Sequence, residues 1–303
     1  MKQSNSIRVA GYPYTGIIDW DVETINKIIK QVNNFDCLPK FGLKRVEIHP
    51  TSLCQYNCPF CYGVNFKKKQ KNDLPLKFIE QNILKSIKNS KLNKDDPIII
   101  LAGLYSEPLA HAERMELIKL LGKYNFRFGI YTNGGFLNEE LSRAICESAK
   151  QNRGGRKSYI SLNVIGAIEN GDFNSLEKKI KYFVKFRDSI NAPIQINVPI
   201  LVNGNISAVK LRKLQDKLLE IGINKIRYSM PQVPILKNLI SKPALDNIKL
   251  IESLKKYNMN NVFVRSISGK QFDRCYVMAN TVFIDNKGLV YPCSQINNLI
   301  QFV

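Results

Sequence analysis

The stretch Glu47-Ile-His-Pro-Thr-Ser-Leu-Cys54-Gln-Tyr-Asn-Cys58-Pro-Phe-Cys61-Tyr62 places three cysteines within eight residues. It follows the β-type run at residues 43–48, so the thiols should lie in a loop that leaves a strand. Thiolates are soft ligands that select zinc, copper(I) or iron–sulfur clusters, and three of them at C-x3-C-x2-C spacing can surround one compact centre. An open metal position is where cofactor or substrate chemistry takes place, and no fourth ligand lies nearby in the sequence. The stretch therefore predicts a reactive metal centre.

Zinc is the alternative metal for these thiols. A structural zinc ion needs four ligands, usually from two paired modules, and no second C-x2-C pair or histidine pair follows in the chain. The pattern therefore favours an iron–sulfur cluster over zinc.

Composition predicts a globular protein without a membrane span. The chain has 303 residues, 44% of them hydrophobic and 10% aromatic, enough for one large core or a core plus a small appendage. The first residues lack an apolar signal segment, and no run reaches the roughly 18 apolar residues of a membrane helix. We therefore expect a cytoplasmic protein with no membrane partner. Seven cysteines, an odd number, fit metal ligation in a reducing compartment better than disulfides.

The net charge of +20 raises the question of an acidic partner. Lysines are spread along the whole chain, with denser runs at residues 67–71 and 153–157. Neither run is interleaved with aromatics in a nucleic-acid-binding motif, so we assign them to solvated surface and do not expect a nucleic-acid partner.

From residue 43 the sequence alternates short β-branched runs with amphipathic stretches, which predicts repeated βα units. The expected strands are residues 44–49, 97–102, 126–132, 159–164, 194–201 and 225–229. The expected helices are residues 75–90, 111–123, 138–150, 174–189, 206–220 and 244–257. Six units are fewer than the eight of a closed barrel. The prediction is an α/β fold, an open partial (β/α)6 TIM barrel whose mouth at the strand C-termini carries the function.

Three parts are expected along the chain. Residues 1–42 form a lead-in with one amphipathic helix, residues 43–260 form the partial barrel, and residues 261–303 form a small β appendage. The appendage should contain a hairpin around the turn Asn286-Lys287-Gly288.

The cysteine spacing, with Phe60 in an aromatic slot, resembles the signature of the radical S-adenosylmethionine enzymes. The preceding Glu47-x-x-x-Thr51-x-x-Cys54 context extends the match. The resemblance implies the same partial barrel, a 4Fe–4S cluster and S-adenosylmethionine bound at its open iron. It makes Cys54, Cys58 and Cys61 the metal ligands, and places Phe60 and Tyr62 beside the cofactor.

Two further segments carry the resemblance at the ends of the second and third expected strands. The segment Gly103-Leu-Tyr-Ser106-Glu107-Pro108 is similar to the family's Gly-Gly-Glu segment, which binds the methionyl amine, although Ser106 replaces a glycine. An ordinary β-turn is the alternative. Thr132 and Asn133 resemble the start of the family's Thr-Asn-Gly segment.

Polar residues on the next three strands complete the expected cofactor site. Ser161-Leu-Asn163 is similar to the family's Ser-Leu-Asp, whose side chains contact the methionyl carboxylate or the ribose. Asn163 replaces the acid and can still bond a hydroxyl. Asn197 and Arg227 are placed for cofactor or substrate contact, and a satisfied structural polar group is the alternative for either.

Cys275 and Cys293 form a C-x12-Gly-x4-C pattern similar to the opening of SPASM or twitch appendages, which hold auxiliary clusters. The further cysteines of that pattern are absent. Three explanations stay open: a second iron–sulfur cluster that borrows Cys37, a shortened chain, or no second cluster. In the last case Cys275 or Cys293 could return a hydrogen atom to a substrate radical, as in the epimerases of the family. By default, Cys37 and Cys146 are expected to be core or loop thiols, the commonest role of a free cysteine.

The resemblance implies the reaction and its partners. A reduced cluster would cleave S-adenosylmethionine to a 5'-deoxyadenosyl radical that takes hydrogen from a substrate C–H bond, with the electron coming from a donor such as flavodoxin or ferredoxin. A peptide substrate, epimerised or cross-linked, is our first expectation. A small metabolite such as an aminosugar or nucleotide is the alternative. A zinc-bearing basic nucleic-acid-binding module is the alternative from another class.

Overall fold

The computed structural model describes nine segments of the chain: residues 43–58, 61, 72–90, 96–103, 106–152, 157–202, 207–229, 262–264 and 281–291. Several predictions lie outside them, namely those for the lead-in, for the helix at residues 244–257, and for Cys37, Phe60, Tyr62, Cys275 and Cys293.

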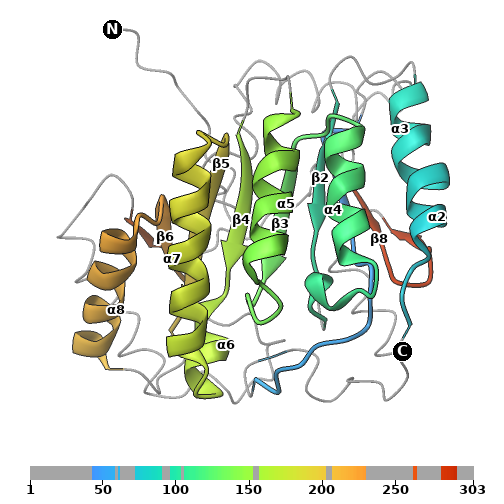
Figure 1. Ribbon diagram of the computed structural model, residues 1–303. Coiled ribbons are helices and arrows are strands. Elements are labelled where there is room, and N and C mark those ends of the chain that lie inside the picture. The colour runs from blue at the N-terminus through green and yellow to red at the C-terminus, as the bar shows by residue number, and fades with distance from the viewer. Residues whose placement is uncertain are drawn as a thin grey trace, which may run out of the picture.

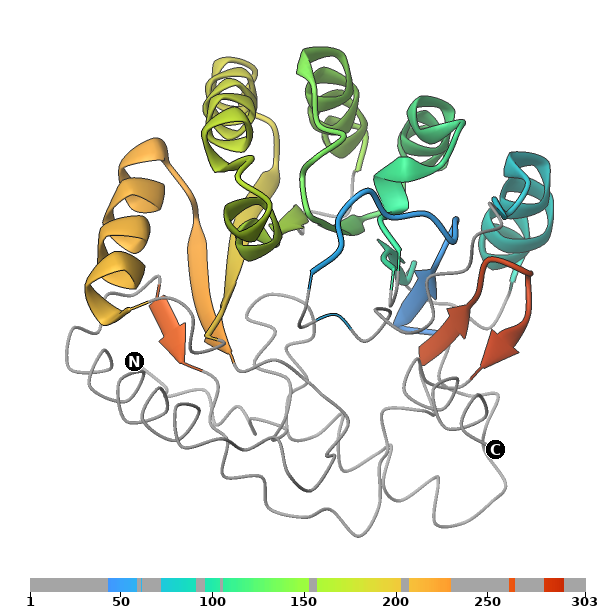
Figure 2. The same cartoon turned by 90° about the horizontal axis from the view of Figure 1, so that it is seen from below.

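The described strands form one curved sheet in the order β7-β6-β5-β4-β3-β2-β1-β8-β9. They are β1 (Arg45–Ile48), β2 (Ile98–Leu101), β3 (Phe128–Thr132), β4 (Ser158–Leu162), β5 (Ile194–Leu201), β6 (Lys225–Ser229), β7 (Val262–Val264), β8 (Thr281–Ile284) and β9 (Val290–Tyr291). All neighbouring pairs are parallel except β8 with β9. The sheet is an open arc with helices along its convex side (Figures 1 and 2), which confirms the predicted partial barrel.

The helices connect consecutive parallel strands. They are α2 (Leu76–Phe78), the π-helical segment η2 (Ile79–Leu84), α3 (Lys85–Asn89), the 3-10 turn η3 (Pro108–Ala110), α4 (Arg114–Lys123), α5 (Glu139–Lys150), α6 (Val164–Glu169), α7 (Phe173–Ser189) and α8 (Ala208–Ile221). Local signals set their ends. The side chain of Asn138 caps α5 by accepting from the backbone N–H of Leu141, and Gly222, at φ +101°, ends α8 in the left-handed region.

The fourth strand ends earlier than predicted. We expected a strand through residue 164, but β4 stops at Leu162 and Val164 begins the short helix α6. The backbone N–H of Asn163 still bonds the carbonyl of Thr132 at 2.8 Å, which extends the ladder by one residue before the chain turns. A short apolar run such as Val164-Ile165 fits a strand or a buried helix equally well, which explains the error.

The two faces of the sheet have different neighbours. Along β5 the buried residues alternate with half-buried ones, and the buried set is Ile194, Ile196, Val198 and Ile200. These belong to the main core between sheet and helices. A second cluster, the concave cluster, comprises Ile98, Ile100, Ala102 and Tyr159 with Tyr131 packed against it. Because strand side chains alternate between faces, residues such as Asn197 point to the concave side.

The predicted hairpin is present, and its first strand extends the sheet. β8 pairs in parallel with β1, from Arg45 opposite Thr281 to Ile48 opposite Ile284. Phe283 is 2% exposed, and its ring meets that of His49 edge to face with centroids 4.3 Å apart. β1, which leads into the cysteine stretch, therefore has a hydrogen-bonded neighbour on each side. Within the described part of the chain, no helix has the length and apolar character needed to cross a bilayer.

Replacing Phe283 tests whether the hairpin is integral to the barrel. Phe283→Ala should lower the free energy of unfolding by about 3 kcal/mol, because it empties a buried aromatic site against β1. Leu289→Ala in the same hairpin, where the side chain is 52% exposed, should change it by less than about 0.5 kcal/mol. Urea unfolding followed by circular dichroism measures both. Equal, small effects would mean that the barrel is stable without this strand.

Candidate active site

The predicted site residues gather at one edge of the sheet. The cysteine loop follows β1, the segment from Gly103 to Glu107 follows β2, Asn133 follows β3 and Asn163 follows β4. Parallel strands end on the same side, so their loops meet. The backbone N–H of Glu107 bonds the carbonyl of Leu53 at 2.7 Å, which joins the second loop directly to the first.

The start of the cysteine loop is fastened by a buried threonine. The hydroxyl of Thr51 donates to Asp73 Oδ1 at 2.6 Å and accepts from the backbone N–H of Leu53 at 3.2 Å. Asp73 Oδ2 accepts from the N–H of Ala112 at 3.0 Å. The backbone N–H of Leu74 also bonds the carbonyl of Pro50 at 2.8 Å. The chain just before Cys54 is thus held to two other segments.

Helix α6 supports the middle of the loop. A Cβ added to Gly166 would lie 3.1 Å from Cys58 Sγ and 3.4 Å from the Tyr56 ring, so a larger residue would require the cysteine loop to shift. Tyr56 is 6% exposed, and burial, with a smaller contribution from the carboxylate of Asp172, raises its pKa to about 12. Its phenol therefore stays neutral at ordinary pH.

The three cysteines are half-buried and form no disulfide. The backbone N–H of Cys61 bonds the carbonyl of Cys58 at 3.0 Å, and Cys54 Sγ accepts from Asn133 Nδ2 at 3.7 Å. Among the residues that the structure describes, no three His, Cys, Asp or Glu side chains are gathered as closely as a metal site requires. The role of the three thiols as cluster ligands stays a prediction. Their chemistry fits a cluster, because thiolates are soft ligands for iron and all three lie in one loop outside any disulfide.

Gly103 lies directly against Ser106. A Cβ on Gly103 would lie 2.1 Å from the carbonyl oxygen of Ser106, so no other residue fits there without movement. Ser106 is half-buried and Glu107 is 2% exposed. Glu107 is therefore buried close to the end of β2.

Glu107 uses its carboxylate to hold its neighbours. Oε1 accepts from the hydroxyl of Thr132 at 2.6 Å and from the N–H of Leu109 at 3.1 Å, and Oε2 accepts from the N–H of Asn133 at 2.7 Å. Burial raises the pKa of Glu107 to about 7, although these three hydrogen bonds work in the opposite direction. Because the chain's own donors occupy both oxygens, the predicted contact with a ligand ammonium stays a prediction.

The concave face carries the remaining predicted residues. Ser161 on β4 lies opposite Asn197 on β5, and Arg227 on β6 lies opposite Pro199, two residues further along β5. The Oδ1 atoms of Asn163 and Asn197 are buried and make no hydrogen bond within the described structure. Buried polar atoms are normally paired, so these two amides are suited to a polar ligand group.

Three residues that support the site were not predicted from the sequence. Gln55 contacts Asn133, Gly166 packs against Cys58, and Asp73 bonds Thr51. The two residues of each pair are distant in sequence. Both described histidines have polar partners. His49 Nε2 lies 2.9 Å from Glu47 Oε1, and His111 Nδ1 accepts from a backbone N–H.

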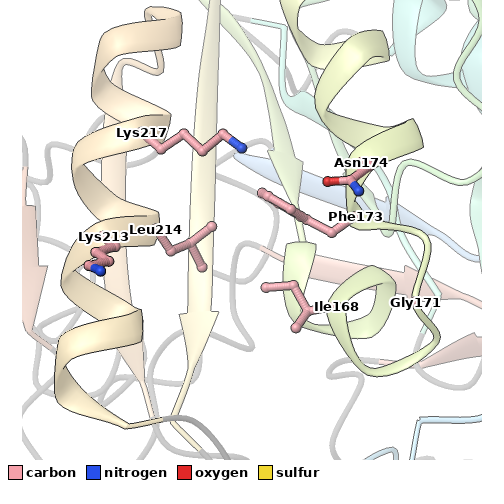
Figure 3. Close-up of a pocket in the computed structure, with 7 residues that line it drawn as sticks. All are labelled: Ile168, Gly171, Phe173, Asn174, Lys213, Leu214 and Lys217. Atoms are coloured by element: carbon pink, nitrogen blue, oxygen red, sulfur yellow. The ribbon is translucent and has the colours of Figure 1, made fainter.

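A separate hollow of about 320 Å³ lies between α7 and α8 (Figure 3). It is lined by Ile168, Gly171, Phe173, Asn174, Lys213, Leu214 and Lys217. None of the predicted site residues reaches it, so the strand ends remain the candidate site.

The pH dependence of stability tests the environment of Glu107. The folded-state pKa is raised from 4.5 to about 7, so between these values the folded chain keeps a proton that the unfolded chain has lost. The free energy of unfolding should therefore fall as pH rises through that window, by at most about 3 kcal/mol. Glu107→Gln cannot titrate and should show a flatter profile in urea unfolding. Parallel profiles for the two proteins would contradict the assignment.

Curated proteins resemble this chain at low sequence identity. No protein-family model matches it. It is 23% identical over 236 residues to the tungsten-containing aldehyde ferredoxin oxidoreductase cofactor-modifying protein of Pyrococcus furiosus, covering 74% of this chain and 62% of that protein. It is 24% identical over 269 residues to an uncharacterized protein of Methanocaldococcus jannaschii, covering 85% and 87%.

Among solved structures, Streptococcus suis SuiB bound to S-adenosylmethionine matches with a TM-score of 0.62 and 18% identity, over 90% of this chain and 65% of SuiB. The chain thus spans less than two thirds of both SuiB and the Pyrococcus protein. The resemblance indicated by the cysteine stretch is confirmed at the level of fold: the chain has the partial barrel of the radical S-adenosylmethionine enzymes.

Proposed function

We propose that this protein is a radical S-adenosylmethionine enzyme whose 4Fe–4S cluster binds Cys54, Cys58 and Cys61. The observation that carries the proposal is that three thiols outside any disulfide lie in one loop at the strand ends, while buried amide oxygens without a hydrogen bond lie after β4 and on the concave face of β5. Thiolates suit iron, and the amide oxygens of Asn163 and Asn197 suit hydroxyl or ammonium donors of a cofactor.

When bound, the cluster and S-adenosylmethionine supply a 5'-deoxyadenosyl radical able to take hydrogen from a C–H bond. The chain's own part is to position the reactants and exclude water. The concave cluster provides an apolar wall from β2 and β4. Ser161 and Asn197, opposite each other on neighbouring strands, provide polar contacts beside it.

A peptide is the substrate that we propose first. SuiB, whose fold this chain shares, has been solved bound to its precursor peptide SuiA, with a TM-score of 0.61 to this chain. The net charge of +20 would attract an acidic peptide segment at low ionic strength. A small molecule is the second candidate, because the Pyrococcus relative is named for modifying a cofactor. The electron would come from a donor such as flavodoxin or ferredoxin, and a second cluster involving Cys275 and Cys293 stays a prediction.

Cleavage of S-adenosylmethionine tests the assignment. Protein reconstituted anaerobically with iron and sulfide should form 5'-deoxyadenosine when given S-adenosylmethionine and dithionite, as measured by liquid chromatography. Cys58→Ala should lose this activity and much of its iron, because a cluster ligand is removed. Cys146→Ala is the matched control, since Cys146 is fully buried in α5 and burial raises its pKa to about 12.

Two outcomes would overturn the assignment. One is equal formation of 5'-deoxyadenosine by the wild-type protein and Cys58→Ala. The other is colourless protein that contains one zinc ion and no acid-labile sulfide, which would support a zinc-bearing module instead.

The packing of α6 against the cysteine loop supplies a second test. Gly166→Val should lower the iron content after reconstitution, because its side chain would enter the space held by Cys58 and Tyr56. Gly171→Asn is the control, since nothing lies within 4 Å of a Cβ there and asparagine tolerates the φ of +75°. Thermal unfolding establishes that both variants fold. Full iron content in Gly166→Val would show that the loop does not need this contact.

A further inference from the structure

The amide of Asn133 reaches the first cysteine across one intervening strand. Asn133 follows β3 and Cys54 lies in the loop after β1, with β2 between those strands in the sheet. Asn133 Nδ2 lies 3.7 Å from Cys54 Sγ, which is within hydrogen-bond range for a sulfur acceptor. Nδ2 also lies 3.4 Å from Gln55 Oε1. The amide is therefore shared between the thiol and the residue next to it.

The orientation of this amide is fixed by its other end. Asn133 Oδ1 lies 2.8 Å from the backbone N–H of Gly135 and 2.7 Å from Gln55 Nε2. A backbone N–H can only donate, so the atom that faces it must be the oxygen of the side chain. The opposite atom is then the NH2 group, which has only hydrogens to offer. The oxygen and nitrogen of an asparagine side chain are often hard to tell apart, but this backbone N–H assigns them, so the NH2 group of Asn133 faces Cys54 Sγ.

The backbone of Asn133 is held by Glu107, and Glu107 is held by the cysteine loop. Asn133 N–H donates to Glu107 Oε2 at 2.7 Å, and Glu107 N–H donates to the carbonyl of Leu53 at 2.7 Å. Leu53 immediately precedes Cys54. The bonds thus form a closed circuit that starts beside Cys54, passes through Glu107 and Asn133, and returns to the sulfur of Cys54.

We propose that Asn133 is a positioning residue that raises the reduction potential of the cluster by donating a hydrogen bond to Cys54 Sγ. This rests on the proposed function, in which Cys54 is a thiolate ligand. Reduction adds one electron, and part of that charge resides on the ligand sulfurs. An N–H donor at a sulfur stabilises the reduced form more than the oxidised form, and such bonds are among the factors that set iron–sulfur potentials.

Two variants separate the hydrogen bond from the charge. Asn133→Ala removes the donor without adding charge. Asn133→Asp removes the donor, keeps an oxygen for Gly135 and Gln55, and adds a negative charge. Each should make reduction less favourable by about tenfold, which equals about 59 mV for one electron, and the aspartate should have the larger effect. Asn174→Ala, at an exposed amide on α7, is the control and should leave the potential unchanged.

The readout is the midpoint potential of the reconstituted cluster, titrated with dithionite and followed by electron paramagnetic resonance without S-adenosylmethionine. Circular dichroism and thermal unfolding establish that each variant folds. A lower potential in both Asn133 variants supports the inference. An unchanged potential in Asn133→Ala, with a shift only in Asn133→Asp, would overturn it, because charge alone would then explain the effect.

The remaining outcomes are also decisive. If both variants fold but take up no iron, Asn133 is needed for cluster assembly and the inference about potential is wrong. If the wild-type protein itself takes up no cluster, the proposed function and this inference fall together. If the wild-type protein cleaves S-adenosylmethionine and the Asn133→Ala potential equals that of wild type, the function stands and only the inference fails.

Discussion

The buried carboxylate of Glu107 connects three strand ends, and the candidate site depends on it. It receives donors from Thr132 and Asn133 after β3 and from its own 3-10 turn after β2, while its backbone binds the loop after β1. A carboxylate enclosed in this way costs free energy through lost hydration, and its hydrogen bonds offset part of that cost. The buried carboxylate of Glu107 is accommodated because the parallel strands bring its hydrogen-bond donors to the same edge of the sheet.

The sequence predicts the barrel well where patterning is repetitive. The strand at residues 194–201 and the strand at residues 225–229 are as predicted, because β-branched residues alternate or run together between clear helical stretches. The ends of the other strands and helices differ from the predictions by up to three residues. Helix α6 was missed since its six residues are too short to show a helical period. The periodicity of apolar residues therefore identifies the fold, but it does not reveal short helices such as α6.

Part of the candidate site was predicted from motif resemblance and not from the periodicity of apolar residues. Motif resemblance selected Glu107, Thr132, Asn133 and Asn163, all of which lie at the predicted edge. It did not reveal how they contact one another, because the bonds join residues 25 or more positions apart. Gln55 and Gly166 carry no signal of their own, since a glutamine beside a cysteine and a glycine in an apolar run are both common. Their roles become visible only in the structure, where Gln55 contacts Asn133 and Gly166 packs against Cys58.

The pairing of β8 with β1 has a consequence for how the cysteine loop is anchored. A strand at the border of a sheet can slip by two residues or peel away, but β1 is fixed by ladders on both sides. The residue at which the chain leaves the sheet is thereby set, and so is the length of chain between that point and the first thiol. The hairpin of β8 and β9 thus fixes the point at which the cysteine loop begins, although none of the candidate site residues described above belongs to it.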